Sequence, residues 1–404
     1  MSDFNARHVI EALRSGVPSR AVGEYFSEAR PGMMKRVSDR LNAVRETGKS
    51  QGMIFTGRYG EGKTHLLNTV FNMASASNMV VSYVSLGKET PIDKPYLLYQ
   101  KLVASTYLPG AAQPGFRHKL EELTPGSGIA GELLAYTVKE LETDKLYYLL
   151  QAYLGTQEEE ERTAFLADLE GDFTTGAAIR KSFRRVTGKA AKFEHNFSKT
   201  RHGFDYFHFL SHFFTLLGYE GWVLLFDEAE LLGRLGKKVR ARSYRAMEAF
   251  LQPSPSLERV FSLFAFSSSY VEDVIDKKHE FENVDAAFAD DPESLKAARA
   301  ALEAILSAPE LAPLTKGEIL KVLERICGLH ASAYDWEPKV SAQTVYDATQ
   351  AGGYLLRTKI RAAIEFLDQL YQYGEAGSTR ITELGRESFE EYEDGGEVPE
   401  LPEL

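Results

Sequence analysis

The chain has 404 residues, 44% hydrophobic and 26% charged, which is enough to bury a full core in two or three packed units. Its net charge of −11 is concentrated in residues 383–404, where nine acidic residues face one basic residue, so we expect a loosely docked acidic tail. A single cysteine, Cys327, excludes a disulfide within the chain, and the absence of an apolar leader or an 18-residue apolar run predicts a cytoplasmic protein without a membrane segment.

Four short apolar runs predict β-strands: Met53–Thr56, Met79–Leu86, Trp222–Phe226 and Phe261–Phe266. Their nearly continuous apolarity is typical of parallel strands that are buried on both faces. Helical patterns separate them, for example over 64–74 and 206–217. The predicted fold is therefore α/β with a parallel sheet.

Two helical regions interrupt or follow this alternation. Residues 110–201 are long, charged and helix-patterned, which predicts an all-α insertion between the second and third strands. After Pro313 a capping box, Thr315 with Glu318, opens an amphipathic helix, and two further helices are expected near Ala342 and Thr358. These three helices predict a small helical unit at residues 313–375.

A phosphate-binding motif lies between the first strand and the helix that follows it. The pattern GxxxxGK[ST] is matched at every fixed position by Gly57, Arg58, Tyr59, Gly60, Glu61, Gly62, Lys63 and Thr64, and His65 follows. Glycines let the backbone wrap around phosphates, and the helix N-terminus favours negative charge. Lys63 is expected to reach the β- and γ-phosphates of ATP, and the Thr64 hydroxyl is expected to bind Mg2+.

The third strand ends in Asp227 and Glu228, at the sheet edge where α/β proteins bind their ligands. Asp227 is predicted to hold the magnesium through water. Glu228 is predicted to polarise the attacking water, so hydrolysis of ATP is favoured over binding alone.

Two further positions resemble parts of AAA+ ATPases. Ser267 begins a run of three serines at the end of the fourth strand, which resembles the sensor-1 position; the alternative is an ordinary turn. Arg357 opens the last long helix and resembles the sensor-2 arginine of an AAA+ lid, with Arg361 as the second choice; the alternative is a solvated surface arginine.

Several stretches together resemble the BREX-type ATP-binding proteins of bacterial phage defence. They are residues 6–18, the loop 57–64 with the three residues after it, Lys88–Pro91, Asp227–Glu230 and Pro313–Thr315. The resemblance implies an AAA+ protein of the origin-recognition kind that works beside a helicase or another DNA-processing partner. The chain departs from that pattern at Asp168–Gly171, which stands in place of a tryptophan-leucine-x-glycine element, and it ends without a winged-helix domain.

Taken together, these features predict five parts. They are an N-terminal helical segment that contributes to the nucleotide site (1–50), an ATPase core (51–109 and 202–312), the insertion (110–201), a helical lid (313–375) and the acidic tail (376–404). The predicted function is an ATPase that assembles or loads a partner on DNA. A non-hydrolytic, ATP-gated interaction protein and a transposition-type regulatory ATPase stay open as alternatives.

Two basic runs bear on the partners. Residues 180–201 hold eight Lys or Arg against one Glu, with three phenylalanines between them that are candidates to stack on bases; a solvated helix face is the favoured alternative. Residues 233–245 hold six basic residues and no acidic one. Arg240, Arg242 and Arg245 are candidates for an arginine that completes the ATP site of a neighbouring copy, so a homo-oligomer is considered.

Overall fold

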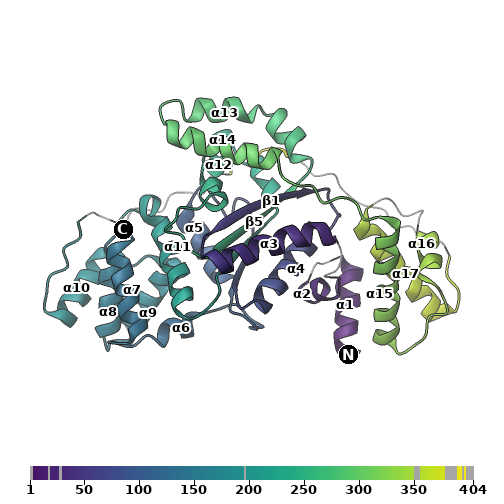
Figure 1. The fold of residues 1–404 in the computed structure, drawn as a ribbon, viewed down its shortest axis with the longest axis horizontal. Coiled ribbons are helices and arrows are strands. Elements are labelled where there is room, and N and C mark those ends of the chain that lie inside the picture. The colour runs from purple at the N-terminus through teal and green to yellow at the C-terminus, as the bar shows by residue number, and fades with distance from the viewer. Residues whose placement is uncertain are drawn as a thin grey trace.

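The computed structural model of the chain describes residues 3–16, 19–26, 30–194, 197–349, 355–377, 389–393 and 395–396. Figure 1 shows a central sheet with one group of helices on its left and another on its right. The left group comes from the middle of the chain, and the right group combines the first helix with the last ones.

The sheet has five strands in the order β1-β5-β4-β2-β3. Their bounds are Gln51–Gly57 for β1, Val80–Ser85 for β2, Thr106–Tyr107 for β3, Trp222–Asp227 for β4 and Val260–Ser267 for β5. The four predicted strands are all present and parallel, so the α/β prediction is confirmed. The short β3 is antiparallel to β2 and was not predicted, because two residues carry no recognisable hydrophobic period.

The strand order places the site. Although β1 and β2 follow each other in the sequence, β5 and β4 lie between them. Beyond β1, the segment around Glu310 adds a parallel bridge to Thr56: the Thr56 amide donates to the Pro309 carbonyl at 3.0 Å, and the Leu311 amide donates to the Thr56 carbonyl at 2.7 Å. The strand that leads into the phosphate-binding motif is thus paired on both sides, which fixes where the loop begins.

Helices cover both faces of the sheet. One face packs on α3 (Pro31–Thr47) and α4 (Lys63–Ala76), and the other packs on α5 (Pro95–Ala104), α11 (Lys199–Leu216) and α12 (Lys237–Leu251). Successive residues of a strand alternate between the faces, as Met53 and Ile54 do. Burial on both sides accounts for the nearly continuous apolarity of the strands.

The insertion packs on α5 and α11, two helices that cover the sheet, and its apolar cluster is continuous with theirs. Its helices are α6 (Arg117–Glu121), α7 (Gly128–Lys139), α8 (Lys145–Gly155), α9 (Glu159–Ala167) and α10 (Gly176–Thr187). Their buried side chains join the cluster that covers the α11 face of the sheet. A buried ion pair lies within this region: Lys145 Nζ is 2.7 Å from Asp168 Oδ2, and the Tyr206 hydroxyl donates to Asp168 Oδ1 at 2.6 Å. Asp168 opens the stretch that departs from the family pattern, and here it fastens α8 to α11.

Two helices between β5 and the lid were not anticipated from the sequence. They are α13 (Glu280–Ala287) and α14 (Pro292–Leu306), and both pack on α12. Figure 1 shows them above the sheet, at the edge that β1 forms.

The right group joins the two ends of the chain. It contains α1 (Asp3–Ser15), α15 (Lys316–Tyr334), α16 (Ala342–Thr349) and α17 (Leu356–Tyr373), while α2 (Arg20–Tyr25) connects it to α4. The three helices expected after Pro313 are present, and the capping box of Thr315 and Glu318 is formed. Because α1 packs on α15 and α17, the N-terminal segment lies beside the helices that follow Pro313.

Part of the acidic tail is bound to the core. The Gly236 amide donates to the Gly395 carbonyl at 2.7 Å, and the Tyr392 amide donates to the Arg234 carbonyl at 2.8 Å. The expected loose docking therefore does not describe these residues. Within the described ranges, no helix combines the length and apolarity needed to cross a membrane.

Candidate functional site

The phosphate-binding loop connects the end of β1 to the start of α4. Gly60 and Gly62 have φ values of 75° and 92°, in the left-handed region that a side chain disfavours. A Cβ atom at Gly57 would lie 3.2 Å from Leu311 and 3.3 Å from the Lys63 side chain. The loop therefore needs glycine at these positions, and it leads into a helix whose first residue is Lys63. Free amide groups at such a helix start favour an anionic ligand.

Lys63 is buried and already has an anionic partner. Its ammonium donates to the Gly57 carbonyl at 3.2 Å and lies 3.4 Å from Glu230 Oε1. Both side chains are only 9% exposed. The positive charge is thus held at the base of the loop, within reach of a phosphate that would replace the carboxylate.

Asp227 is fixed in orientation at the end of β4. Its Oδ2 accepts from the Tyr83 hydroxyl at 2.6 Å, and its Oδ1 accepts from the Glu228 amide at 2.9 Å. Tyr83 comes from β2, whose Ser85 pairs with Asp227 in the parallel register. Burial and the Asp227 charge raise the pKa of the Tyr83 phenol, so it stays a hydrogen-bond donor near neutral pH.

Glu228 directly follows the strand and has a left-handed backbone, with φ of 52°. Partial burial raises the pKa of its carboxyl, and the neighbouring Asp227 charge raises it further. A hydrogen bond with Ser85 and the charges of Lys63 and Arg234 act in the opposite direction. A carboxyl with a raised pKa is a stronger base when ionised, which suits proton acceptance from water.

These groups line one cavity of about 650 Å³. This volume lies in the range of small-molecule sites. The predicted residues that line it are Arg58, Tyr59, Gly60, Glu61, Gly62, Lys63, Thr64, His65, Asp227, Glu228 and Arg357. Apolar side chains from the N-terminal segment and the lid complete the wall, among them Leu13, Phe26, Val322 and Ile360.

The start of α17 touches the phosphate-binding loop. The Arg357 amide donates to the Gly60 carbonyl at 3.2 Å, while its guanidinium donates to the Tyr59 hydroxyl at 3.2 Å and to the Gly16 carbonyl. Arg361, one turn later, donates to the Arg14 carbonyl at 3.2 Å and does not line the cavity. Of the two arginines considered, Arg357 is the one at the cavity.

A comparison with protein families matches residues 1–121 and 136–384 to the family described as BREX system ATP-binding protein BrxC/D. The chain belongs to this family. It is an ATP-binding protein of the BREX phage-defence system, as the resemblance implied. A search of curated proteins and a search of solved structures find no match.

In this BrxC/D-family protein Gly57, the first residue of the motif, does not line the cavity, although its carbonyl accepts from the Lys63 ammonium. Two further expected positions do not line it either. Ser267 is buried at the end of β5, opposite Gly57 in the sheet register, with its hydroxyl 3.1 Å from that of Ser269. The loop Lys88–Pro91 closes on itself, since the Thr90 amide donates to the Gly87 carbonyl at 3.2 Å. Both lie at the same edge of the sheet as the cavity, without facing it.

Several polar side chains of the cavity were not predicted from the sequence, among them Arg30, Tyr83 and Glu230. The Arg30 guanidinium donates to the backbone carbonyl of Glu61 at 2.5 Å and lies 3.2 Å from its carboxylate, so it holds the loop from the N-terminal side. Tyr83 precedes the end of its strand by two residues, and this spacing was the available signal. Glu230 lies within the stretch Asp227–Glu230, and no pattern in the sequence assigned it a role. Nothing in the sequence marked Arg30.

The side chains of the cavity can also be tested for their fit to a magnesium ion. No group of three or more His, Cys, Asp or Glu side chains that could hold a metal ion occurs in the part of the chain that the structure describes. Thr64 and Asp227 line the same cavity, however, and Asp227 presents an oriented carboxylate. Mg2+ takes most of its ligands from phosphate and water and only one or two from protein. The residues therefore fit a cation that arrives together with the nucleotide.

Proposed function

We propose that this BrxC/D-family protein is an AAA+-like ATPase, which binds ATP with magnesium, hydrolyses it, and uses the change in lid position to act on a protein partner at DNA. The observation that carries the proposal is the convergence on one cavity of four side chains from three places in the fold, the start of α4, the end of β4 and the start of α17: Lys63, Asp227, Glu228 and Arg357. A protein that only binds nucleotide has no need of the Glu228 carboxylate.

Each side chain has a role in this proposal. Lys63 leaves Glu230 and binds the β- and γ-phosphates, while Thr64 and Asp227 hold the magnesium. Magnesium supplies charge neutralisation of the phosphates when bound. Glu228 orients the attacking water and accepts its proton, and Arg357 reads the phosphates from the lid.

The lid contact gives hydrolysis a mechanical consequence. The Arg357 backbone and side chain bridge Gly60, Tyr59 and Gly16, so α17 rests on both the loop and α1. A γ-phosphate that recruits the Arg357 guanidinium must compete with the Tyr59 and Gly16 contacts. Binding and loss of that phosphate then favour different lid positions, and this difference is what a ligand-driven switch requires.

The test uses two variants. Lys63→Ala removes the charge that faces the phosphates and is expected to abolish tight ATP binding in calorimetry. Glu228→Gln keeps the size of the side chain but cannot accept a proton, so it should bind ATP and lose hydrolysis by about 100-fold or more. Glu324→Gln on the exposed face of α15 serves as the matched control.

Two results contradict the proposal in different ways. ATP binding that survives Lys63→Ala removes the site assignment. Wild-type protein that binds ATP tightly yet releases no phosphate, with or without DNA, supports the non-hydrolytic, ATP-gated alternative.

The partner surface is also a proposal. In the first basic run, Phe183 is buried, and Phe193 and Phe197 pack partly buried against the core, with Arg180 4.5 Å from the Phe193 ring. Stacking of these rings on bases, the less favoured of the two interpretations, is therefore not supported, and the rings pack as the favoured alternative expects. If this surface binds DNA directly, it does so through contacts with the DNA phosphates. The exposed cations available for such contacts lie on α10 and on the loop after it: Lys181, Arg184, Lys189 and Lys192.

A further inference from the structure

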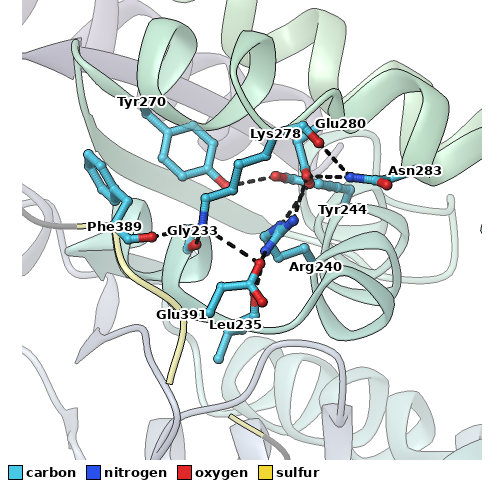
Figure 2. Close-up of polar contacts among 10 residues, drawn as sticks. All are labelled: Gly233, Leu235, Arg240, Tyr244, Tyr270, Lys278, Glu280, Asn283, Phe389 and Glu391. Atoms are coloured by element: carbon cyan, nitrogen blue, oxygen red, sulfur yellow. Dashed lines mark hydrogen bonds and ion pairs between the residues drawn. The ribbon is translucent and has the colours of Figure 1, made fainter. Parts of the chain in front are cut away.

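Residues 389–393 and 395–396 pack on the core beside the proposed ATPase site, and we call the surface that they cover the groove. Figure 2 shows Phe389 against Tyr270, Glu391 against Arg240, and Lys278 between the two tail residues. The groove floor is made by α12, by Val271–Asp276 and by the 3-10 helical segment Ala229–Arg234, which directly follows Glu228. We call residues 389–393 and 395–396 the docked tail.

The docked tail adds a half-exposed carboxylate to a buried ion pair. Arg240 and Glu280 are 2% and 0% exposed, and the Arg240 Nε and one terminal nitrogen donate to the two Glu280 oxygens at 3.0 and 2.8 Å. The other terminal nitrogen donates to Glu391 and to the Leu235 carbonyl. Lys278 adds a second cation, 3.7 Å from Glu391. Glu280 is buried with Arg240, while Lys278 and Glu391 are 21% and 46% exposed, so Glu391 supplies the second negative charge from the solvent side of the pair.

Backbone contacts give the docked tail its register. The Lys278 ammonium donates to the Phe389 carbonyl at 2.7 Å and to the Gly233 carbonyl at 2.9 Å. The Tyr392 amide donates to the Arg234 carbonyl, and the Gly236 amide donates to the Gly395 carbonyl. The docked tail also forms a turn, in which the Gly395 amide donates to the Tyr392 carbonyl at 2.8 Å, so main-chain bonds, an aromatic anchor and an acidic anchor together fix its position.

Glycine makes the close approach feasible. A Cβ atom at Gly233 would lie 3.1 Å from the Phe389 ring, and one at Gly236 would lie 3.2 Å from the Gly395 carbonyl. On the opposite wall, the buried hydroxyls of Tyr244 and Tyr270 bond each other at 2.7 Å, which leaves the Tyr270 ring as an apolar surface for Phe389.

The groove is continuous with the nucleotide site through one short segment. Ala229–Arg234 starts next to Glu228 and contains Glu230, the partner of Lys63. Its last two residues carry the carbonyls that Lys278 and Tyr392 bind. The docked tail thus contacts the last residues of the segment Ala229–Arg234, whose second residue, Glu230, pairs with Lys63.

We propose that this groove is a docking site for an acidic, aromatic peptide, and that the chain's own docked tail fills it reversibly. Release of the docked tail loosens the Ala229–Arg234 segment and thereby changes the rate of hydrolysis. The last part rests on the proposed ATPase function. The docking itself does not.

The first experiment measures docking without nucleotide. Full-length Glu391→Gln removes the charge that pairs with Arg240, and full-length Glu393→Gln removes an exposed tail charge as the matched control. A fluorescent peptide with the sequence of residues 389–396 is titrated into each chain. Because the attached tail competes at high effective concentration, the peptide should bind Glu391→Gln about 10-fold more tightly than wild type or the control. The same peptide carrying Glu391→Gln should bind all three weakly.

Hydrogen exchange then reports the coupling. Amides of 229–236 and 389–396 should exchange faster in Glu391→Gln than in Glu393→Gln, and hydrolysis should differ between these two variants by about threefold or more. Equal peptide affinity in the three chains overturns the docking site. A dimer in wild type that Glu391→Gln converts to monomer overturns docking within one chain and assigns the tail to a neighbouring copy. If the wild type hydrolyses ATP and Glu391→Gln shows faster exchange but the same hydrolysis rate as Glu393→Gln, the coupling is overturned. If the wild type does not hydrolyse ATP but the peptide still binds as expected, only the proposed function is overturned.

Discussion

Lys63 Nζ lies 3.4 Å from Glu230 Oε1 at the base of the cavity, with both side chains nearly buried. ATP must displace this carboxylate, and the Glu230 charge also repels the incoming phosphates. We expect Glu230→Gln to bind ATP roughly 10-fold more tightly than wild type, because an amide competes less well for the lysine. Calorimetry with Glu324→Gln as control checks this, and weaker binding by Glu230→Gln would show that Glu230 supports the ligand.

As the pH is lowered, the rate of hydrolysis should begin to fall at a pH above the ordinary pKa of glutamate. Burial first and the Asp227 charge second raise the pKa of Glu228, so the ionised base is lost as the pH falls through that raised value. Single-turnover rates at saturating ATP between pH 5 and 8 measure this fall. Since the hydrogen bond from Ser85 lowers the pKa of Glu228, Ser85→Ala should move the fall to higher pH. A fall that Ser85→Ala does not move assigns the titration to another group.

Replacing Arg357 should change ATP affinity and hydrogen exchange at the start of α17, whereas replacing Arg361 should not. Arg357→Ala removes the contacts with Tyr59 and Gly16 and the cation at the cavity, so ATP affinity should fall several-fold and the start of α17 should exchange faster in ATP. Arg361→Ala, one turn later, loses only the contact with the Arg14 carbonyl and is the matched control. Equal losses in the two variants would indicate a structural effect on the lid rather than a contact with nucleotide.

The sequence predicted the strands, the loop and the polar strand end because each depends on short-range chemistry. A buried parallel strand requires apolar residues on both faces, and the Gly60 and Gly62 conformations require glycine. Arg30 and Tyr83 escaped prediction because their roles arise from partners far along the chain: Arg30 reaches Glu61, and Tyr83 reaches Asp227 across the sheet.

The docking of residues 389–393 and 395–396 escaped prediction for a related reason. Its acidic composition predicts a solvated segment when it is taken alone. Its anchors are complementary charges on α12 and beside α13, which are more than 100 residues away. Long-range complementarity of this kind leaves no periodic trace in a single sequence.

The structure narrows the search for an arginine supplied to a neighbouring copy. Arg240 is held by Glu280 and Glu391 inside the chain, whereas Arg242 and Arg245 are exposed on α12. Arg242 also compensates the nearly buried Asp93 at 3.1 Å, so its removal has a structural cost. We expect hydrolysis per molecule to rise with protein concentration or with added partner, and Arg245→Ala to lose this rise while keeping ATP affinity. A constant specific activity, with one sedimenting species in ATP, contradicts the idea.

The Lys145–Asp168 pair should be asymmetric in its contribution to stability. Asp168 also accepts hydrogen bonds from the Tyr206 hydroxyl and the Thr174 amide, whereas the Lys145 ammonium otherwise faces aromatic rings, with the Phe197 centroid 4.2 Å away. Asp168→Asn places an amide donor against that buried ammonium, and the free energy of unfolding should fall by about 3–5 kcal/mol.

Lys145→Met leaves Asp168 with two donors and replaces the ammonium by an apolar side chain among the rings, so its cost should be roughly half as large. Burial also lowers the pKa of Lys145, which means that the folded protein releases this proton more readily than the unfolded chain. Stability attributable to Lys145 should therefore increase as the pH rises through the lowered value, relative to Lys145→Met. Urea unfolding of both variants at two pH values measures the asymmetry. Equal, small losses would mean that the pair is hydrated and contributes little to holding α8 against α11.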